Sequence, residues 1–306
     1  MPEKDVCILI PTLNEGATIA QLIRDFRSEG FNNILVIDGN STDKTRELSK
    51  AEGARVIVQR GKGKGQAVQE AFEKLDNEYL VMLDGDGTYL ASDVHAMLAP
   101  LFEGRAEHVI GNRLVNFEKG AFPGLNLIGN KLINYLFSMA YRQHLTDILT
   151  GYRAFTRDVY KSLDLKEMGF EVESEMTIQS IKLDHVIEVV PISYLCRKSD
   201  AATKLNPLKD GFRIGKTIYR LARFHNPMFY FGLIGAIFIL SGLITGTYVV
   251  DQWLQGITRI PMTVLTALLI MSGFQMFVLG MLSDLMVSMH METMRFLRRQ
   301  NKSGKQ

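Results

Sequence analysis

Two long apolar runs in the C-terminal third most constrain how this chain can fold. Residues 227–250 and 262–289 carry almost no charge, and each reaches the roughly 20 residues that a helix needs to cross a bilayer. The 306 residues also exceed the usual domain size of about 100 to 150 residues, so a full globular domain is expected before these runs. We therefore predict a soluble domain over residues 1–205, followed by two transmembrane helices within residues 226–290.

Basic side chains gather beside both apolar runs. Residues 206–225 mix them with apolar residues, which favours a juxtamembrane helix lying on an anionic leaflet, although an ordinary surface helix has the same pattern. The tail 291–306 is also basic, whereas the connection 251–261 holds Arg259 as its only cation. The positive-inside rule then predicts an integral protein of the cell membrane, with the soluble domain and both termini in the cytosol.

Composition argues against two other classes of protein. The net charge is +2, from 35 basic and 33 acidic residues, so no nucleic-acid partner is expected. The two cysteines, Cys7 and Cys196, lie in apolar, strand-like runs, which favours buried reduced thiols over a disulfide or a zinc site. The six histidines show no ligand spacing, so surface or core positions are expected for them.

Up to residue 83 the sequence alternates short apolar runs with amphipathic stretches. This rhythm predicts βαβ units, with strands over 6–10, 34–37, 56–58 and 79–83 and helices over 19–26, 44–51 and 66–75. Such units build an α/β fold with a mostly parallel, Rossmann-like sheet, and ligands bind beyond the carboxyl ends of its strands. Later segments are less regular, with helices expected over 125–141 and 173–183 and strands over 153–155 and 186–196.

Polar motifs stand where three of these strands end. They are Pro-Thr-Leu-Asn-Glu at 11–15, Asp-Gly-Asn-Ser-Thr-Asp at 38–43 and Asp-Gly-Asp-Gly-Thr at 84–88. With these motifs the chain resembles a family-2, GT-A-fold glycosyltransferase of the dolichyl-phosphate mannose synthase type over residues 5–205. It is most similar to the archaeal dolichyl-phosphate sugar transferases that initiate N-glycosylation of S-layer proteins and archaellins, which also have two C-terminal spans.

Asp84 and Asp86 are separated by a single glycine. Two carboxylates at this spacing suit a hard divalent cation, Mg²⁺ or Mn²⁺, that also grips diphosphate oxygens. Such a cation would stabilise a leaving nucleoside diphosphate, which gains negative charge as the sugar departs. Taken alone, the pair could equally form a plain Asp-Gly turn, but the two other motifs favour the metal site.

The resemblance implies a pocket for a nucleotide sugar. Its residues would be Pro11, Asn14, Glu15, Asp38, Lys64, Asp84 and Gly85. Glu15 could instead cap the helix that follows it. Lys64 stands in a glycine-rich segment that opens the third helix, where free N–H groups favour an anion, although a basic surface loop fits nearly as well.

The acceptor side carries arginines and an aspartate. Arg113 is expected to end the fifth strand, where the resemblance implies an arginine near the acceptor phosphate, and a guanidinium fork fits phosphate bidentately. Arg197 and Lys204 follow the last strand and would clasp phosphates, with Lys198 as an alternative. Asp147 precedes a Gly-Tyr-Arg motif and would orient or deprotonate the acceptor. Because a phosphate nucleophile is already ionised near neutral pH, positioning could suffice.

Three further acids are ambiguous at this level. Glu173 and Glu175 lie on a predicted helix and could hold a sugar hydroxyl, although a solvated acidic face fits the pattern as well. Asp284 lies inside the second apolar run, where a carboxylate is costly. It could face the other span, the headgroups or a subunit of a homo-oligomer.

Together these residues predict inverting transfer of a sugar from a nucleoside diphosphate sugar to dolichyl or polyprenyl phosphate, with a UDP-sugar favoured by the resemblance. The rival interpretations are elongation of a lipid-linked glycan or polysaccharide and a non-catalytic component of lipid-sugar translocation. Processive synthases of this fold carry a Gln-x-x-Arg-Trp motif, and the one tryptophan, Trp253, falls in the expected loop between the spans. A translocation component would not need the acidic pair, and two spans leave little room for a path.

Overall fold

The computed structural model describes residues 5–122, 124–167, 169, 171–197, 211–212, 214–217, 219 and 226–303, without the side chains of 124, 125, 290–292 and 294–303. The chain forms two compact units, one of residues 1–138 and 144–217 and the other of residues 139–143 and 218–306. Residues 139–143 therefore belong to the same unit as the C-terminal helices, although the sequence places them within the first 205 residues.

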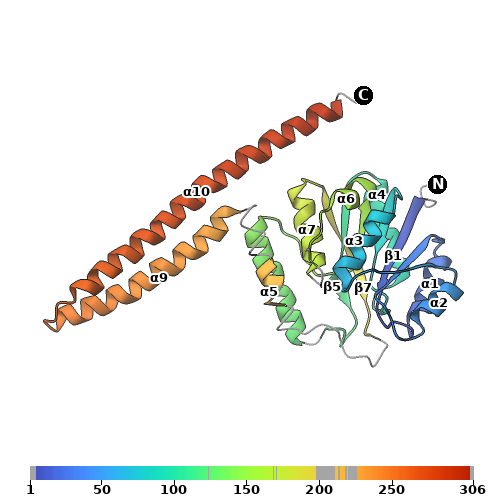
Figure 1. The fold of residues 1–306 in the computed structure, drawn as a ribbon, viewed down its shortest axis with the longest axis horizontal. Coiled ribbons are helices and arrows are strands. Elements are labelled where there is room, and N and C mark those ends of the chain that lie inside the picture. The colour runs from blue at the N-terminus through green and yellow to red at the C-terminus, as the bar shows by residue number, and fades with distance from the viewer. Residues whose placement is uncertain are drawn as a thin grey trace. The chain divides into compact units, whose positions relative to one another are not determined.

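The larger unit is built on a seven-stranded sheet in the order β3-β2-β1-β4-β6-β5-β7 (Figure 1). The strands are β1 (Val6–Thr12), β2 (Ile34–Asp38), β3 (Arg55–Val58), β4 (Tyr79–Met82), β5 (His108–Phe117), β6 (Arg153–Thr156) and β7 (Ile187–Tyr194). Strand β6 runs antiparallel to both of its neighbours, and the other pairings are parallel. The predicted mostly parallel α/β sheet is confirmed, with one reversed strand near its middle.

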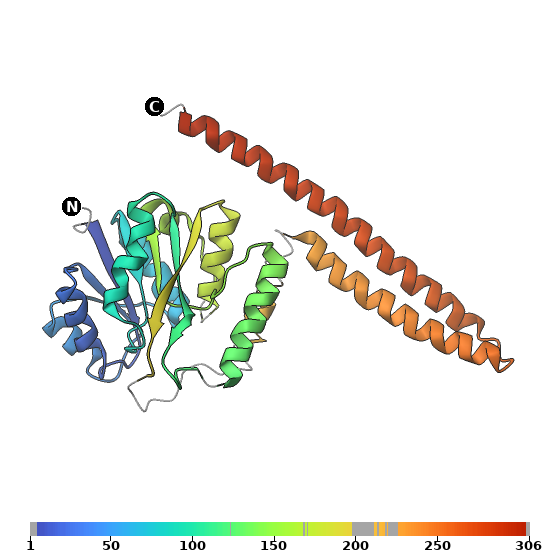
Figure 2. The ribbon, with the colours of Figure 1, turned by 180° about the vertical axis from the view of Figure 1, so that it is seen from behind.

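Helices cover both faces of this sheet, as the views from front and back show (Figure 2). One face carries α1 (Ile19–Ser28), α2 (Thr45–Ala51) and α4 (Val94–Phe102). The short 3₁₀ helix η2 (Ala91–Asp93) comes directly before α4. The other face carries α3 (Lys64–Lys74), α6 (Arg157–Ser162) and α7 (Val172–Lys182). Strand β1 shows why: Val6 and Ile8 point into the first core, whereas Cys7 and Leu9 point into the second. Alternate residues of a strand face opposite sides, so an apolar strand buried on both faces needs helices on both.

Three expectations for the later segments need correction. Arg113 does not end the fifth strand, because β5 continues to Phe117, with a register shift against β7 between Asn112 and Asn116. The run 186–196 forms a single strand, β7, and Cys196 lies beyond it and is only partly buried. Cys7 is buried as expected, and neither thiol forms a disulfide. The predicted helix over 125–141 is present as α5 (Gly124–Tyr141).

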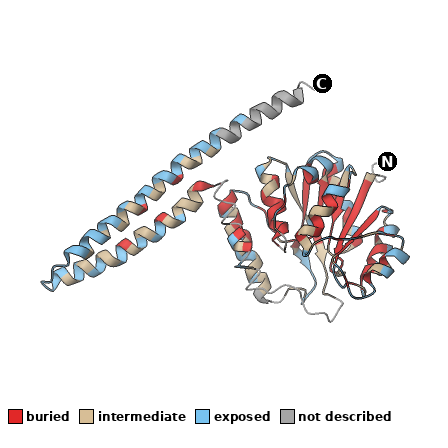
Figure 3. Ribbon diagram, in the orientation of Figure 1, coloured by how far each residue is buried: buried red, intermediate tan, exposed pale blue. Residues whose placement is uncertain are grey.

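The second unit consists mainly of α9 (Pro227–Leu254) and α10 (Ile260–Ser303). Both are long and apolar enough to cross a membrane, and their described side chains are mostly exposed or half-buried (Figure 3). Trp253 lies in the last turn of α9 rather than in a loop, and the basic tail continues α10 up to Ser303. Most of the predicted juxtamembrane helix, residues 206–225, lies outside the described residues.

Two glycines let α9 and α10 approach closely. A Cβ atom on Gly235 would lie 2.8 Å from the carbonyl oxygen of Gly273, and one on Gly273 would lie 2.9 Å from that of Gly235. The hydroxyl of Thr266 also donates to that of Thr245 at 3.1 Å across the same pair of helices. Small residues and hydroxyl pairs of this kind hold helices together where no hydrophobic driving force is available.

This close approach predicts that Gly235→Ala destabilises the helical hairpin. The added methyl group would meet backbone that cannot move aside, and overpacking of this kind costs about 1–3 kcal/mol. Gly232→Ala is the matched control one turn earlier, because a Cβ there meets its nearest atom at an ordinary 3.6 Å. Thermal unfolding of the detergent-solubilised protein should show a lower Tm for the first variant alone, and equal Tm values would contradict this packing.

Candidate active site

The three polar motifs meet at one edge of the sheet. The chain runs from β1 outwards to β2 and β3 and then crosses to β4 on the other side of β1. Such a switch point opens a crevice at the carboxyl ends of the two diverging strands. Glu15 follows β1, and Asp84 and Asp86 follow β4. Because β6 is reversed, the loop before it, residues 145–152, also reaches this edge.

Hydrogen bonds tie the loop after β1 to the loop after β2. The side chain of Asn14, a residue with φ of 54°, accepts from the backbone N–H of Thr42 at 2.8 Å, and its own N–H donates to the hydroxyl of Ser41 at 2.8 Å. Asp38 is fully buried and accepts from the backbone N–H of Ser41 at 2.9 Å. Pro11 is buried within β1. These predicted nucleotide-binding residues therefore shape the two loops that border the crevice.

Lys64 lies between two carboxylates. It is the first residue of α3, and its ammonium contacts Asp84 and lies 2.6 Å from Oε1 of Glu173, in the first turn of α7. Burial by itself would lower the pKa of Lys64, but the two carboxylates outweigh it and raise that pKa. Lys64 therefore stands at the start of a helix, between two carboxylates, and not in a basic surface loop.

Glu173 is buried, so the alternative of a solvated acidic face is wrong for it. Burial raises its pKa, and so does the nearby Asp84, whereas Lys64 acts in the opposite direction. Its second oxygen, Oε2, is buried without a hydrogen-bond partner among the described residues. Glu175 is also buried, but its carboxylate accepts from the backbone N–H groups of Lys166 and Glu167 at 2.8 to 3.0 Å. Glu173 therefore joins the Lys64 ion pairs, whereas Glu175 binds these backbone amides.

Gly151 presses against this group, and the sequence did not single it out as a site residue. A Cβ atom there would lie 2.4 Å from Oδ2 of Asp84 and 3.1 Å from Nζ of Lys64. Its backbone N–H donates to the hydroxyl of Tyr89 at 3.0 Å. A side chain at this position would displace the carboxylate of Asp84, and the Gly-Tyr-Arg motif was the signal that could have revealed it.

A second ion-paired group contains the other aspartate. Nη2 of Arg197 lies 3.3 Å from Oδ2 of Asp86 and 3.3 Å from Oε1 of Glu15. The Glu15 side chain faces Arg197, and its main-chain oxygen accepts from the backbone N–H groups of Thr18 and Ile19 at the start of α1. Nε of Arg197 is buried without a partner among the described residues. Lys198 and Lys204 lie outside the part of the chain that the structure describes.

Arg113 and Asp147 form a bidentate pair. Nε and Nη2 of the arginine donate to the two carboxylate oxygens at 2.8 and 2.9 Å, and the Arg113 backbone N–H donates to Oδ2 at 3.1 Å. Burial would lower the pKa of Arg113, but the fully buried Asp147 carboxylate raises it well above its usual value. The guanidinium also lies 5.3 Å from the ring centroid of Tyr194. Each oxygen of Asp147 is engaged, so this geometry orients Arg113.

A buried guanidinium holds the loop that carries Asp147 and Gly151. Arg153 donates to the carbonyl oxygens of Ile148 and Thr150 at 2.7 and 3.0 Å and to the hydroxyl of Thr177 at 2.9 Å. It also lies 3.2 Å from Nε2 of His108, whose Nδ1 lies 2.9 Å from the hydroxyl of Ser180. Since Arg153 can only donate, Nε2 accepts and Nδ1 carries the proton. His108 is therefore a satisfied core residue.

The charges at this edge suit a divalent cation. Among the residues that the structure describes, the carboxylates of Glu15, Asp84, Asp86, Asp147 and Glu173 form ion pairs with Lys64, Arg113 and Arg197. Asp84 and Asp86 would repel a diphosphate unless a cation lay between them and its oxygens. Among the described residues no group of three His, Cys, Asp or Glu side chains could hold a metal by itself. Two aspartates completed by diphosphate oxygens fit Mg²⁺ or Mn²⁺, because such ions are usually held by one or two carboxylates together with substrate phosphates.

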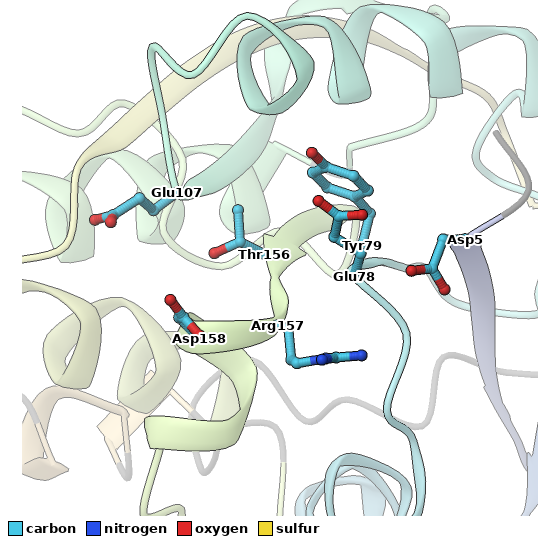
Figure 4. Close-up of a pocket in the computed structure, with 7 residues that line it drawn as sticks. All are labelled: Asp5, Glu78, Tyr79, Glu107, Thr156, Arg157 and Asp158. Carbon is cyan, nitrogen blue, oxygen red and sulfur yellow. The ribbon is translucent and has the colours of Figure 1, made fainter. Parts of the chain in front are cut away.

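A pocket at the opposite edge of the sheet is separate from this chemistry (Figure 4). Its lining residues are Asp5, Glu78, Tyr79, Glu107, Thr156, Arg157 and Asp158. They lie at the start of β1, β4 and β5 and at the end of the reversed strand β6, which are all at the amino ends of the parallel strands. None of the predicted site residues contributes to this pocket.

Known proteins share the sequence over most of the chain. Residues 7–164 match the family described as Glycosyl transferase family 2. The chain is 46% identical over 298 residues to Glycosyltransferase AglJ of Haloferax volcanii, which covers 96% of this chain and 98% of that protein. It is 31% identical to the Dolichyl-phosphate hexose transferase of the same organism, over 71% of this chain and 93% of that protein.

Two more distant relatives carry informative descriptions. A UDP-N-acetylglucosamine–dolichyl-phosphate N-acetylglucosaminyltransferase of Methanococcus voltae is 26% identical, over 72% of this chain and 96% of that protein. A crystal structure of glucosyl-3-phosphoglycerate synthase from Mycobacterium tuberculosis, in complex with Mn²⁺ and UDP-glucose, superimposes with a TM-score of 0.56 at 21% identity, over 72% of this chain and 80% of that one. This structural likeness concerns the fold, and it confirms the GT-A-like architecture.

The His108–Arg153 contact predicts acid sensitivity of the folded state. Burial, and then Arg153, hold the pKa of His108 well below its ordinary value of about 6.5, whereas the unfolded chain keeps that value. Below about pH 6.5 the unfolded state therefore binds more protons, and stability falls by up to about 1.4 kcal/mol for each pH unit. His108→Gln, which cannot become charged, should lose less stability than the unaltered protein between pH 7 and 5.5 in thermal unfolding. His95→Gln, at an exposed site, is the control, and parallel pH curves for all three proteins would contradict this role.

Proposed function

The chain belongs to glycosyltransferase family 2, and we propose that it transfers a sugar, with inversion, from a UDP-sugar to dolichyl or polyprenyl phosphate. The product would be a lipid-linked monosaccharide for protein N-glycosylation. One observation carries the proposal: the Asp84–Asp86 pair stands at the switch point of the sheet in a chain that also has two apolar helices of membrane-spanning length. The descriptions of the dolichyl-phosphate transferases among the relatives support the choice of acceptor.

On the donor side, Asp84 and Asp86 would hold the divalent cation. When bound, that cation would act as a Lewis acid that offsets the charge developing on the leaving diphosphate. Lys64 stands at the start of α3, where helix N–H groups also favour an anion, so its ammonium can turn from Asp84 to the diphosphate while Glu173 keeps it in place. Oε2 of Glu173, which has no hydrogen-bond partner in the part of the chain that the structure describes, would accept a hydrogen bond from a hydroxyl of the sugar.

On the acceptor side, Arg113 would receive the lipid phosphate. The carboxylate of Asp147 fixes the plane of its guanidinium through two hydrogen bonds, which leaves the charge of the group available to an incoming phosphate. A phosphate oxygen attacks the anomeric carbon, the bond from that carbon to the diphosphate oxygen breaks, and the nucleoside diphosphate leaves. The nucleophile needs no deprotonation, because it is already ionised near neutral pH, so we assign Asp147 to positioning. Arg197, between Asp86 and Glu15, would contact a phosphate of either substrate.

The two apolar helices would hold the protein in the membrane that contains the acceptor. Anchoring of the catalytic unit confines its search for the lipid phosphate to the membrane surface. The basic residues before α9 and after the apolar part of α10 favour a cytosolic location of both termini.

The proposal predicts that membranes containing this protein label dolichyl phosphate from one nucleotide sugar in a panel of radiolabelled donors. Label should enter the organic phase only with Mg²⁺ or Mn²⁺ present, and Asp86→Ala should lower the rate by at least about a thousandfold, as expected for loss of a principal electrostatic contribution. Asp164→Ala, an exposed acid away from the site, is the matched control and should keep full activity. Labelling that requires an added glycan-lipid would instead favour an elongating transferase, and activity that persists in chelator would disprove the metal site.

Gly151→Ala should also reduce activity, for a steric reason. The methyl group would displace Asp84 and Lys64, so we expect binding of UDP with Mn²⁺ to weaken by about tenfold or more, consistent with the cost of overpacking. Isothermal titration of the purified protein measures this. Gly129→Ala is the control, because a Cβ there meets nothing within 4 Å. Unchanged affinity in the Gly151 variant would show that this glycine is irrelevant to donor binding.

A further inference from the structure

Asp284 is the single charged side chain in the apolar residues 262–289, and the structure gives it a partner. Nη2 of Arg142 lies 3.2 Å from its Oδ2, although the two residues are 142 positions apart in the sequence. A carboxylate within a membrane span is costly unless it is paired or faces a polar environment. The contact is with an arginine from the segment that follows α5, an environment that was not among the three expected from the sequence.

The packing of the two helices places Asp284 near one end of the hairpin. A Cβ on Gly280 would lie 3.2 Å from Sδ of Met228, so Gly280 stands opposite the first turn of α9. Asp284 follows one turn later on α10 and therefore lies level with the residues that lead into α9. The ion pair is formed at the end where the chain enters the hairpin and not at the middle of a span.

A second contact joins the same two segments at this end. Asn226 caps α9, since its side-chain oxygen accepts from the backbone N–H of Phe229 at 3.0 Å. Its amide nitrogen donates to the carbonyl oxygen of Met139 at 3.3 Å, and the residue is buried. Residues 139–143 therefore contact the hairpin through this hydrogen bond and through the ion pair. We call these two contacts, Asn226–Met139 and Arg142–Asp284, the latch. The same residues form one compact unit with the two helices.

The backbone at Arg142 indicates that its side chain has a role. The residue follows the last turn of α5 with φ of +53°, in the left-handed region, where glycine or asparagine usually ends a helix. An arginine is disfavoured there by contacts of its Cβ atom. Glycine would end the helix at lower cost, but it could not reach Asp284.

The segment after the latch leads directly into the acceptor side of the active site. His144 returns to the catalytic unit, and Asp147, which orients Arg113, comes five residues after Arg142. We propose that the latch, by fixing residues 139–143 to the hairpin, anchors the start of the chain segment that leads to Asp147 and so affects use of the lipid acceptor. Arg142 and Asp284 are then positioning residues for the lipid acceptor, an inference that rests on the proposed function.

The test compares two acceptors in the full-length protein reconstituted in nanodiscs. We expect Asp284→Asn and Arg142→Gln each to lower kcat/KM for long-chain dolichyl phosphate about fivefold, through KM, as suits a partly exposed ion pair. For a water-soluble prenyl phosphate of two isoprene units, kcat/KM of either variant should stay within about twofold of that of the unaltered protein. The affinity for UDP with Mn²⁺ should also stay within about twofold. The charge-swapped double variant Arg142→Asp/Asp284→Arg should restore most of the loss. Asp251→Asn, at the other end of the hairpin, is the matched control.

Each other outcome has a defined meaning. Single variants that match the unaltered protein on the long lipid, or a double variant no better than the single ones, would overturn the latch. Equal losses on both acceptors would also overturn it, because a general structural defect would then explain them. If the unaltered protein labels neither acceptor, the proposed function fails. A double-mutant cycle on the Tm values of the same proteins then tests the contact separately, and absence of coupling would show that the ion pair itself is wrong.

Discussion

A sheet that is buried on both faces disfavours charged side chains on those faces, so catalytic polar groups lie at the ends of its strands. In β1 every residue from Val6 to Thr12 is buried, and alternate side chains enter two different cores. A charged group in either core would lose its hydration without compensation, whereas a group just past the last strand residue stays in contact with solvent and substrate. The carboxylates after β1 and β4 and the arginine on β5 follow from this constraint.

At that edge the protein keeps its charges in pairs. Lys64 is held by Asp84 and Glu173, Arg197 by Asp86 and Glu15, and Arg113 by Asp147. Paired groups keep a defined geometry before any ligand arrives, so less reorganisation is needed when a diphosphate and its cation bind.

The reversed strand β6 brings the two halves of the site together. Its direction carries residues 147–151 to the same edge as the ends of β1 and β4, and Arg153, its first residue, holds that loop by hydrogen bonds to the carbonyl oxygens of Ile148 and Thr150. Gly151 can then lie against Asp84, although the two residues are 67 positions apart in sequence. Residues 139–143 belong to the unit of the helical hairpin, and the residues that follow them belong to the catalytic unit. The two units are therefore joined by continuous chain between positions 143 and 144.

The sequence by itself determined the features that depend on local pattern. Short apolar runs indicated the strands, two long uncharged runs indicated the long helices, and the position of Asp84 and Asp86 after a strand indicated the acidic pair, because each of these signals lies within one continuous stretch of sequence. Partners distant in sequence were decided by the tertiary structure. It joined Asp147 to Arg113 and Asp284 to Arg142, buried Glu173 beside Lys64, turned Glu175 to backbone amides and placed Gly151 against Asp84. Such contacts depend on strand order and direction, and no local spacing encodes which loop a reversed strand will bring to the edge of a sheet.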